Sequence, residues 1–167
     1  MGKDDWLHER CGLRVWSGSP TGWCCRRNHS ALQGVLSGAI QHQVGMKGSD
    51  NIIAINKDKN LLRPENFPSS VPGQGSTIIK NSLGKKILVI NVMGRLFMDP
   101  LNDPVESIEN IISKYNLGLE VDAIIVDIHG EATSEKMSIG HIFDGRVSLI
   151  IGTHTHVPTS DTQILPG

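Results

Sequence analysis

Three histidines near the C-terminal end of the chain have the spacing of a metal site. His129 ends the apolar run IIVDIH, and His154 and His156 follow a second apolar run, VSLIIG. If both runs are neighbouring parallel strands, the three imidazoles meet at the carboxyl edge of a sheet, where α/β proteins bind their ligands. Neutral imidazole suits Zn, Fe, Mn and related transition metals. The sequence therefore predicts a transition-metal site made by these three residues.

The loop after the first apolar run contains further polar residues. Glu131 is either another ligand or an acceptor that fixes the tautomer of a metal-bound imidazole. Thr133 or Ser134 is predicted to cap the following helix, with Glu135 in its first turn. His141 lies inside that helix and is interpreted as a structural or exposed residue.

The chain from residue 61 onward alternates strand and helix signals. Residues 61–76 are rich in proline and glycine and are predicted to form a loop. Residues 76–81 and 86–92, joined by the turn SLGK, are predicted to form a hairpin. The runs 122–128 and 147–152 are almost entirely apolar, which is typical of parallel strands covered on both faces. Together these elements predict an α/β fold with parallel neighbouring strands.

Two helices are predicted between these strands. The first is expected to start with Asp103 as its N-cap and Pro104 at its first position, and to end at Gly118. The second is expected to cover about residues 134–143. The apolar residues that share one face of the first helix are Val105, Ile108, Ile111, Ile112 and Tyr115.

Five motifs connect this part of the chain to a known family. They are LLRPENFP, INVMGRLFM, VDIHGEATSEK, DGRVSLIIGTHTHV and ILPG. Residues 61–167 resemble the YmdB-type bacterial metallophosphoesterases of the calcineurin-like superfamily. The resemblance implies an α/β sandwich and a two-metal phosphodiesterase that acts on cyclic nucleotides or other phosphodiesters. It also implies that His129, His154 and His156 are ligands, with two metals that polarise the phosphoryl group and activate a water for in-line attack.

The N-terminal part departs from the family pattern. Family members carry GD, GEN and GNH motifs, which supply an Asp, a Glu, two Asn and a catalytic His, and residues 1–60 contain none of these motifs. Three imidazoles can hold one metal ion, but they lack the carboxylate that bridges two. We therefore expect an atypical segment at 1–60, and the C-terminal part of a metallophosphoesterase domain at 61–167. The N-terminal half of the family fold is expected to be missing or replaced. As a result, the site is expected to hold one metal ion as an alternative to two, and the activity is expected to be impaired.

A second resemblance leaves other functions open. Residues 35–60 contain SGAIQH, GM and AIN in this order and resemble the FAD-binding segment of the electron transfer flavoprotein alpha subunit. This resemblance implies a flavin-binding electron-transfer fragment with FAD held along Ser37, Gln41, His42 and Asn56. A non-catalytic α/β domain that assembles with another chain, including a homo-oligomer, is a further alternative.

Composition narrows the remaining classes. The 167 residues are 38% hydrophobic and 20% charged, which is compatible with a globular domain. The net charge of −1 predicts no basic surface for nucleic acid. The sequence has neither a bilayer-length apolar run nor a signal-peptide pattern at its start, so no membrane contact and a cytoplasmic location are expected. The three cysteines fall within residues 1–25 and suggest reduced thiols, while residues 1–34 predict no helix or strand.

Overall fold

The computed structural model describes residues 14–17, 59, 61–155, 157 and 159–167. The predicted metal ligand His156 lies outside the described residues. The four residues of the flavin alternative also lie outside them, namely Ser37, Gln41, His42 and Asn56.

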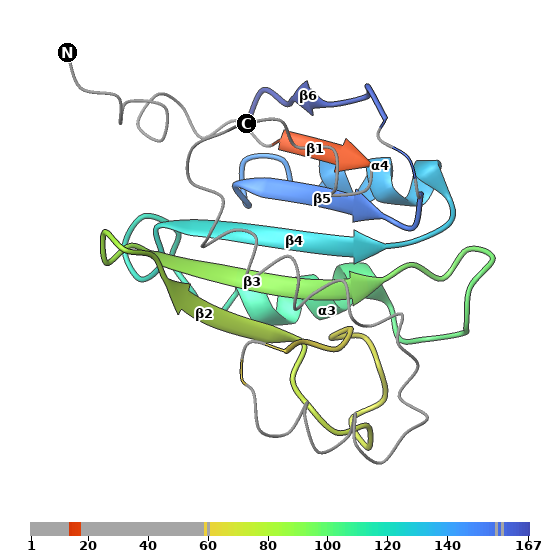
Figure 1. Cartoon of the computed structure of the whole chain (residues 1–167), viewed down its shortest axis with the longest axis horizontal. Helices are drawn as coiled ribbons and strands as arrows, with labels where there is room; N and C mark the ends of the chain where they lie inside the picture. The colour runs from red at the N-terminus through yellow and green to blue at the C-terminus, as the bar shows by residue number, and fades with distance from the viewer. Residues whose placement is uncertain (1–13, 18–58, 60, 156, 158) are drawn as a thin grey trace.

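The described residues form a six-stranded mixed sheet with the order β2-β3-β4-β5-β1-β6 (Figure 1). The strands β3, β4, β5 and β1 are parallel, and β2 and β6 pair antiparallel at the two edges. The predicted hairpin and the predicted parallel α/β sheet are therefore confirmed. The strands are β1 Arg14–Ser17, β2 Ser76–Lys80, β3 Lys86–Met93, β4 Ala123–His129, β5 Leu149–Thr153 and β6 Gln163–Ile164.

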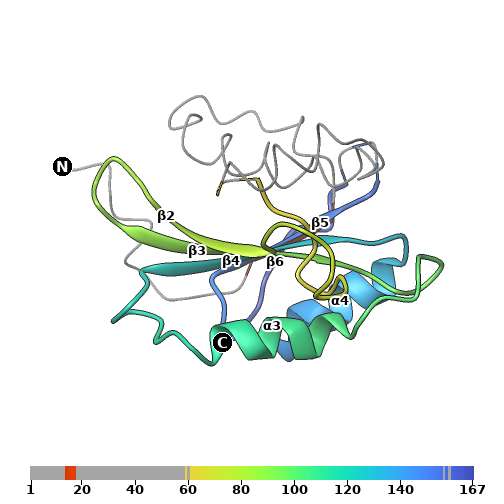
Figure 2. The same cartoon turned by 90° about the horizontal axis from the view of Figure 1, so that it is seen from below.

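The two helices, α3 Pro104–Ile112 and α4 Thr133–Ile142, lie on the same face of the sheet (Figure 2). The chain crosses from β3 to β4 to β5 in one direction, and right-handed crossovers then place both helices on one side. Within the described residues, no helix combines the length and the apolarity needed to cross a membrane.

The main core fills the space between the two helices and the sheet. Side chains alternate along a strand, so every second residue of β3 and β4 faces the helices. The helix-facing core residues include Ile90, Val126 and Ile150 from three strands and Ile108 and Phe143 from the helical side. Residues of the opposite parity form the other face. That second face carries a smaller apolar cluster and, toward the strand ends, Asn91, Asp127, His129 and Thr153.

The start of α3 agrees with the sequence-based prediction, but its end does not. Asp103 caps the helix, and its carboxylate accepts from the backbone N–H groups of Val105 (2.8 Å) and Glu106 (3.2 Å). The predicted stop at Gly118 is wrong, because the helix ends at Ile112. Short-range bonds to the last helical carbonyls close the final turn early, and Gly118, with φ of 87°, serves the later turn into β4.

The predicted cap of α4 is also wrong. Ala132 occupies the N-cap position with extended dihedral angles and makes no side-chain cap bond. Thr133 and Ser134 already belong to the first turn, where a hydroxyl no longer has the N-cap geometry. Glu135 lies in the first turn as expected, which places its carboxylate near the positive end of the helix dipole.

Two strands are absent from the sequence-based prediction. The strand β1 pairs Arg14–Ser17 with the first four residues of β5, and β6 pairs with the other side of β1. A four-residue segment has too few positions to show a periodicity, and its partner lies far along the chain. Because β1 pairs with the side of β5 that faces away from β4, β5 is an interior strand of the sheet and not an edge strand.

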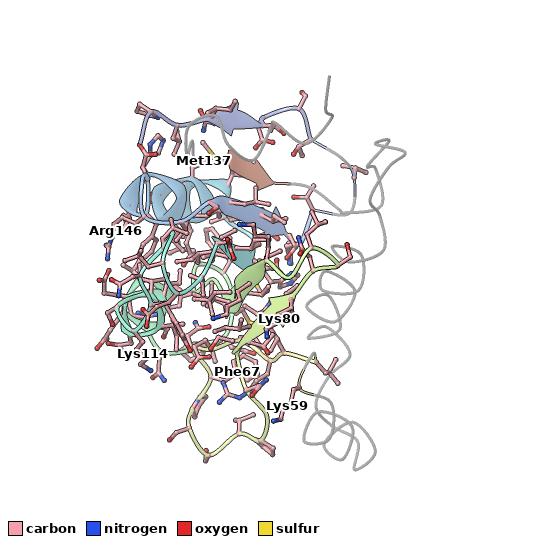
Figure 3. All side chains as sticks on the ribbon, turned by 90° about the vertical axis from the view of Figure 1, so that its left-hand side faces the viewer. Lys59, Phe67, Lys80, Lys114, Met137 and Arg146 are labelled. Atoms are coloured by element: carbon pink, nitrogen blue, oxygen red, sulfur yellow. The ribbon has the colours of Figure 1, made fainter. Side chains whose placement is uncertain are left out.

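Two sets of side-chain contacts link the helices to neighbouring elements, and Figure 3 labels one residue of each, Arg146 and Met137. Arg146, labelled in Figure 3, donates to Glu109 of α3 at 2.6 Å and also stacks on the Phe143 ring. The amide of Gln163 in β6 donates to the Met137 sulfur of α4 at 3.8 Å. These contacts are exposed or partly exposed, so their main effect is on orientation, with little effect on stability.

Candidate metal centre

His129 is the last residue of β4 and lies on the second face of the sheet. Its register partner is Thr153, the last residue of β5, and partners in a parallel pair direct their side chains to the same face. Both residues are buried. The distance from His129 Nδ1 to Thr153 Oγ1 is 3.2 Å. The outward-facing nitrogen of this imidazole is therefore fixed by a hydroxyl from the neighbouring strand.

His154 reaches His129 because the backbone leaves the extended conformation directly after β5. A straight continuation of the strand would direct the residue after Thr153 toward the helices. His154 instead has φ of 99°, and its ring lies on the side of His129. The backbone at His154 is therefore not a continuation of the extended strand. Such a conformation costs a non-glycine residue on the order of 1–3 kcal/mol and is concentrated at functional sites.

The two imidazoles face each other through one nitrogen each. His129 Nε2 and His154 Nδ1 are 3.1 Å apart, and the rings meet edge to face with centroids 4.8 Å apart. The other nitrogen of His154, Nε2, contacts the carboxylate of Glu131. Glu131 therefore contacts a predicted ligand. Such a contact is what its role as an acceptor from a metal-bound imidazole requires.

The spacing of the two facing nitrogens fits a shared metal ion. Two nitrogens that each lie about 2.05 Å from an ion are about 3.3 Å apart in tetrahedral geometry and about 2.9 Å apart at right angles. The observed separation of 3.1 Å lies between these values. Within the residues that the structure describes, no group of three or more His, Cys, Asp or Glu residues is arranged to hold a metal. The geometry thus brings together two of the three predicted ligands, His129 and His154.

A buried polar pair lies beneath the histidines and was missed by the sequence analysis. Asn91 of β3 and Asp127 of β4 are register partners, and the Asn91 amide donates to Asp127 Oδ2 at 3.0 Å. Burial raises the pKa of Asp127 to about 7, against hydrogen bonds from Asn91 and Thr153 that lower it. The sequence did contain a signal for this pair, because Asp127 is an acidic residue in an otherwise apolar strand, two positions before His129.

The loop after β3 is anchored directly to the site. The N–H of Gly94 donates to the carbonyl of His129 at 2.7 Å. The carboxylate of Glu135 accepts from the N–H groups of Arg95 (2.8 Å) and Leu96 (3.3 Å). A Cβ at Gly94 would force this carboxylate to move, so the glycine permits the observed approach. The first turn of α4 and the end of β4 therefore fix the loop together.

Lys136 reaches the same strand end from the opposite, helical side. Its side chain is almost fully buried, and Nζ donates to the carbonyl of Thr153 at 3.3 Å. Burial lowers the pKa of this amine, while the charges of Asp161 and Glu131 raise it. His141, in contrast, is exposed in the last turn of α4, which is one of the two roles that its position suggested.

The fold defines the class of the protein before any relative is considered. It is a parallel α/β sheet with helices on one face (Figure 2), and two facing imidazoles lie at the carboxyl ends of its strands, where such sheets bind ligands. The sequence profile described as YmdB-like protein matches residues 44–167. The chain belongs to this family, which consists of calcineurin-like metallophosphoesterases, as its motifs predicted.

Relatives of known name or structure support this assignment. The chain is 47% identical over 107 residues to the 2',3'-cyclic-nucleotide 2'-phosphodiesterase of Bacillus subtilis (strain 168), covering 64% of this chain and 39% of that protein. It resembles the crystal structure of a novel phosphatase from Mycoplasma pneumoniae with a TM-score of 0.63 and 36% identity, covering 72% of this chain and 43% of that one. A hypothetical protein from Thermus thermophilus gives a TM-score of 0.64 and 26% identity, covering 93% of this chain and 72% of that one. The chain spans about two fifths of the length of the curated relatives that it matches.

Proposed function

We propose that this chain supplies His129, His154 and His156 as ligands to the metal centre of a phosphodiesterase. The observation that carries the proposal is the 3.1 Å approach of His129 Nε2 and His154 Nδ1, with an oxygen beside each outward-facing nitrogen. The name of the Bacillus subtilis relative supports a small cyclic nucleotide, or a related phosphodiester, as the substrate. Imidazole ligands favour zinc, iron or manganese.

The chain's own residues perform three tasks in this proposal. His129 and His154 hold the ion, which supplies Lewis-acid polarisation of the phosphoryl group and activation of a water when it is bound. Glu131 accepts from the outer nitrogen of His154 and so orients that ring. The anchored loop after β3 holds the carbonyl of His129, and with it the end of β4.

Activity is expected to be weak in the chain as it stands. The GD, GEN and GNH motifs, which resemblance assigns to the remaining ligands and to a proton donor, are not found in residues 1–60. With imidazoles alone, the centre is expected to bind about one ion, because a bridging carboxylate is what holds a second one nearby. We therefore propose metal binding with slow hydrolysis.

The experiment compares the chain with two single-histidine variants. Metal-free protein is loaded with Zn²⁺, Mn²⁺ or Fe²⁺, desalted, and analysed for metal content and for hydrolysis of bis-p-nitrophenyl phosphate and 2',3'-cyclic AMP. His154→Ala removes one member of the facing pair, and His141→Ala removes an exposed histidine of α4 as the matched control. We expect bound metal and slow metal-dependent hydrolysis in the parent and in His141→Ala, and loss of both in His154→Ala. Equal metal content in all three proteins would refute the assignment.

A further inference from the structure

Both facing imidazoles have an oxygen against their outward nitrogen. Thr153 Oγ1 lies 3.2 Å from His129 Nδ1, and the carboxylate of Glu131 contacts His154 Nε2. Ligand histidines commonly donate this second ring N–H to an outer acceptor, which fixes the tautomer and the orientation of the ring. Here one acceptor comes from a loop and the other from the neighbouring strand.

The Thr153 hydroxyl has one proton, and the surrounding acceptors decide where it goes. Thr153 Oγ1 is placed to donate to the carbonyl of Ile128 at 3.3 Å. The carboxyl of Asp127 lies on the same face of the sheet as His129 and Thr153. A hydroxyl whose proton is directed to the Ile128 carbonyl can only accept from an imidazole nitrogen. His129 Nδ1 must then carry a proton of its own.

The backbone holds this hydroxyl in place. The carbonyl of Thr153 accepts from the buried Lys136 amine at 3.3 Å, and the N–H of Gly130 donates to the same carbonyl at 3.5 Å. The register of β4 and β5 places Thr153 directly beside His129. The Thr153 hydroxyl is therefore held at a fixed position beside His129 Nδ1.

We infer that Thr153 is a positioning residue of the metal centre, which holds His129 as the Nδ1–H tautomer and so directs the Nε2 lone pair toward His154 and a shared ion. The inference rests on the proposed function in so far as His129 is a ligand. It goes beyond that function because it assigns the tautomer, and the residue that sets it, in the metal-free chain. With the proton on Nδ1, the lone pair of His129 Nε2 faces the space between the two rings, 3.1 Å from His154 Nδ1.

The test reads the tautomer directly. Long-range ¹H–¹⁵N correlation spectra of the ¹⁵N-labelled, metal-free chain at pH 8 distinguish Nδ1–H from Nε2–H for each histidine. His129 is assigned by the peak that is missing in His129→Gln. We expect Nδ1–H for His129 in the parent and in Thr153→Ser, which keeps the hydroxyl, and a mixture or Nε2–H in the nearly isosteric Thr153→Val. An Nε2–H signal for His129 in the parent, or an unchanged tautomer in Thr153→Val, would overturn the inference.

A second readout separates this inference from the proposed function. Zn²⁺ affinity is measured by competition with a chromophoric chelator in the parent, Thr153→Val and Thr153→Ser. We expect the affinity to fall about 10–100-fold in Thr153→Val and to recover largely in Thr153→Ser. If the parent binds no metal but shows the Nδ1–H tautomer, the proposed function fails while the tautomer assignment stands. Equal Zn²⁺ affinity in the parent and in Thr153→Val would overturn the positioning role.

Discussion

Replacing Asp127 with asparagine should remove a pH-dependent cost of folding. Burial raises the pKa of this carboxyl from 3.8 to about 7, so the folded metal-free chain keeps a proton that the unfolded chain loses. Between about pH 4 and pH 7 the unfolded state therefore binds fewer protons than the folded state at this position. Stability must fall as the pH rises through this window, and the contribution is constant above it.

The size of the effect follows from the shift. A difference of about 3 pKa units at 1.36 kcal/mol per unit gives about 4 kcal/mol between pH 4 and pH 8. Asp127→Asn keeps the shape of the side chain and carries no charge at any pH. We therefore expect the variant to match the parent near pH 4 and to be more stable by up to about 4 kcal/mol at pH 8.

The assay is urea unfolding of chelator-treated protein at pH 4, 5.5, 7 and 8.5, with the difference between parent and variant plotted against pH. Glu109 and Asp122 have lowered pKa values because of their pairing with Arg146 and Lys85, and their opposite pH dependence cancels in this difference. Asp99→Asn, at an exposed loop position, is the matched control. A flat difference for Asp127→Asn would refute the reasoning, because folding would then leave the pKa of Asp127 unchanged.

Two further predictions concern the segments that support the site. Asn66→Ala should destabilise the fold by about 3 kcal/mol in urea unfolding, because the buried amide bonds the N–H and C=O of Met93 and the C=O of Asn102. Asn102→Ala, which keeps that carbonyl, should cost far less, and equal losses would contradict this role. Glu135→Ala should release the loop after β3, seen as amide exchange there that is about 10-fold faster, while exchange in the hairpin of β2 and β3 stays unchanged.

The sequence predicted the elements whose signals are local. The turn between β2 and β3, the cap at Asp103 and the apolar runs of β4 and β5 each depend on a few neighbouring residues. The strand β1 could not be predicted in this way, because its four residues are specified by pairing with β5 and β6. The helix ends were misplaced at Gly118 and Thr133 because the tightening of the last turn and the choice of the cap depend on tertiary contacts.

The candidate site was only partly visible in the sequence. The strand ends placed His129 and His154 at one edge, and the structure brings the two rings together. The backbone turn that makes this possible, with φ of 99° at His154, has no local sequence signal such as a glycine. The contacts of Thr153 and Asp127 depend on the register between β4 and β5, which a strand prediction alone does not supply.

The most direct test of the shared ion is X-ray absorption at the zinc edge of the zinc-loaded chain. We predict at least two imidazole ligands at about 2.0–2.1 Å in the parent and an unchanged spectrum in His141→Ala. His154→Ala should retain little or no zinc, and any zinc that stays bound should show weaker imidazole scattering. A parent spectrum without imidazole scattering, or one that His154→Ala leaves unchanged, would contradict the claim that His129 and His154 hold one metal ion.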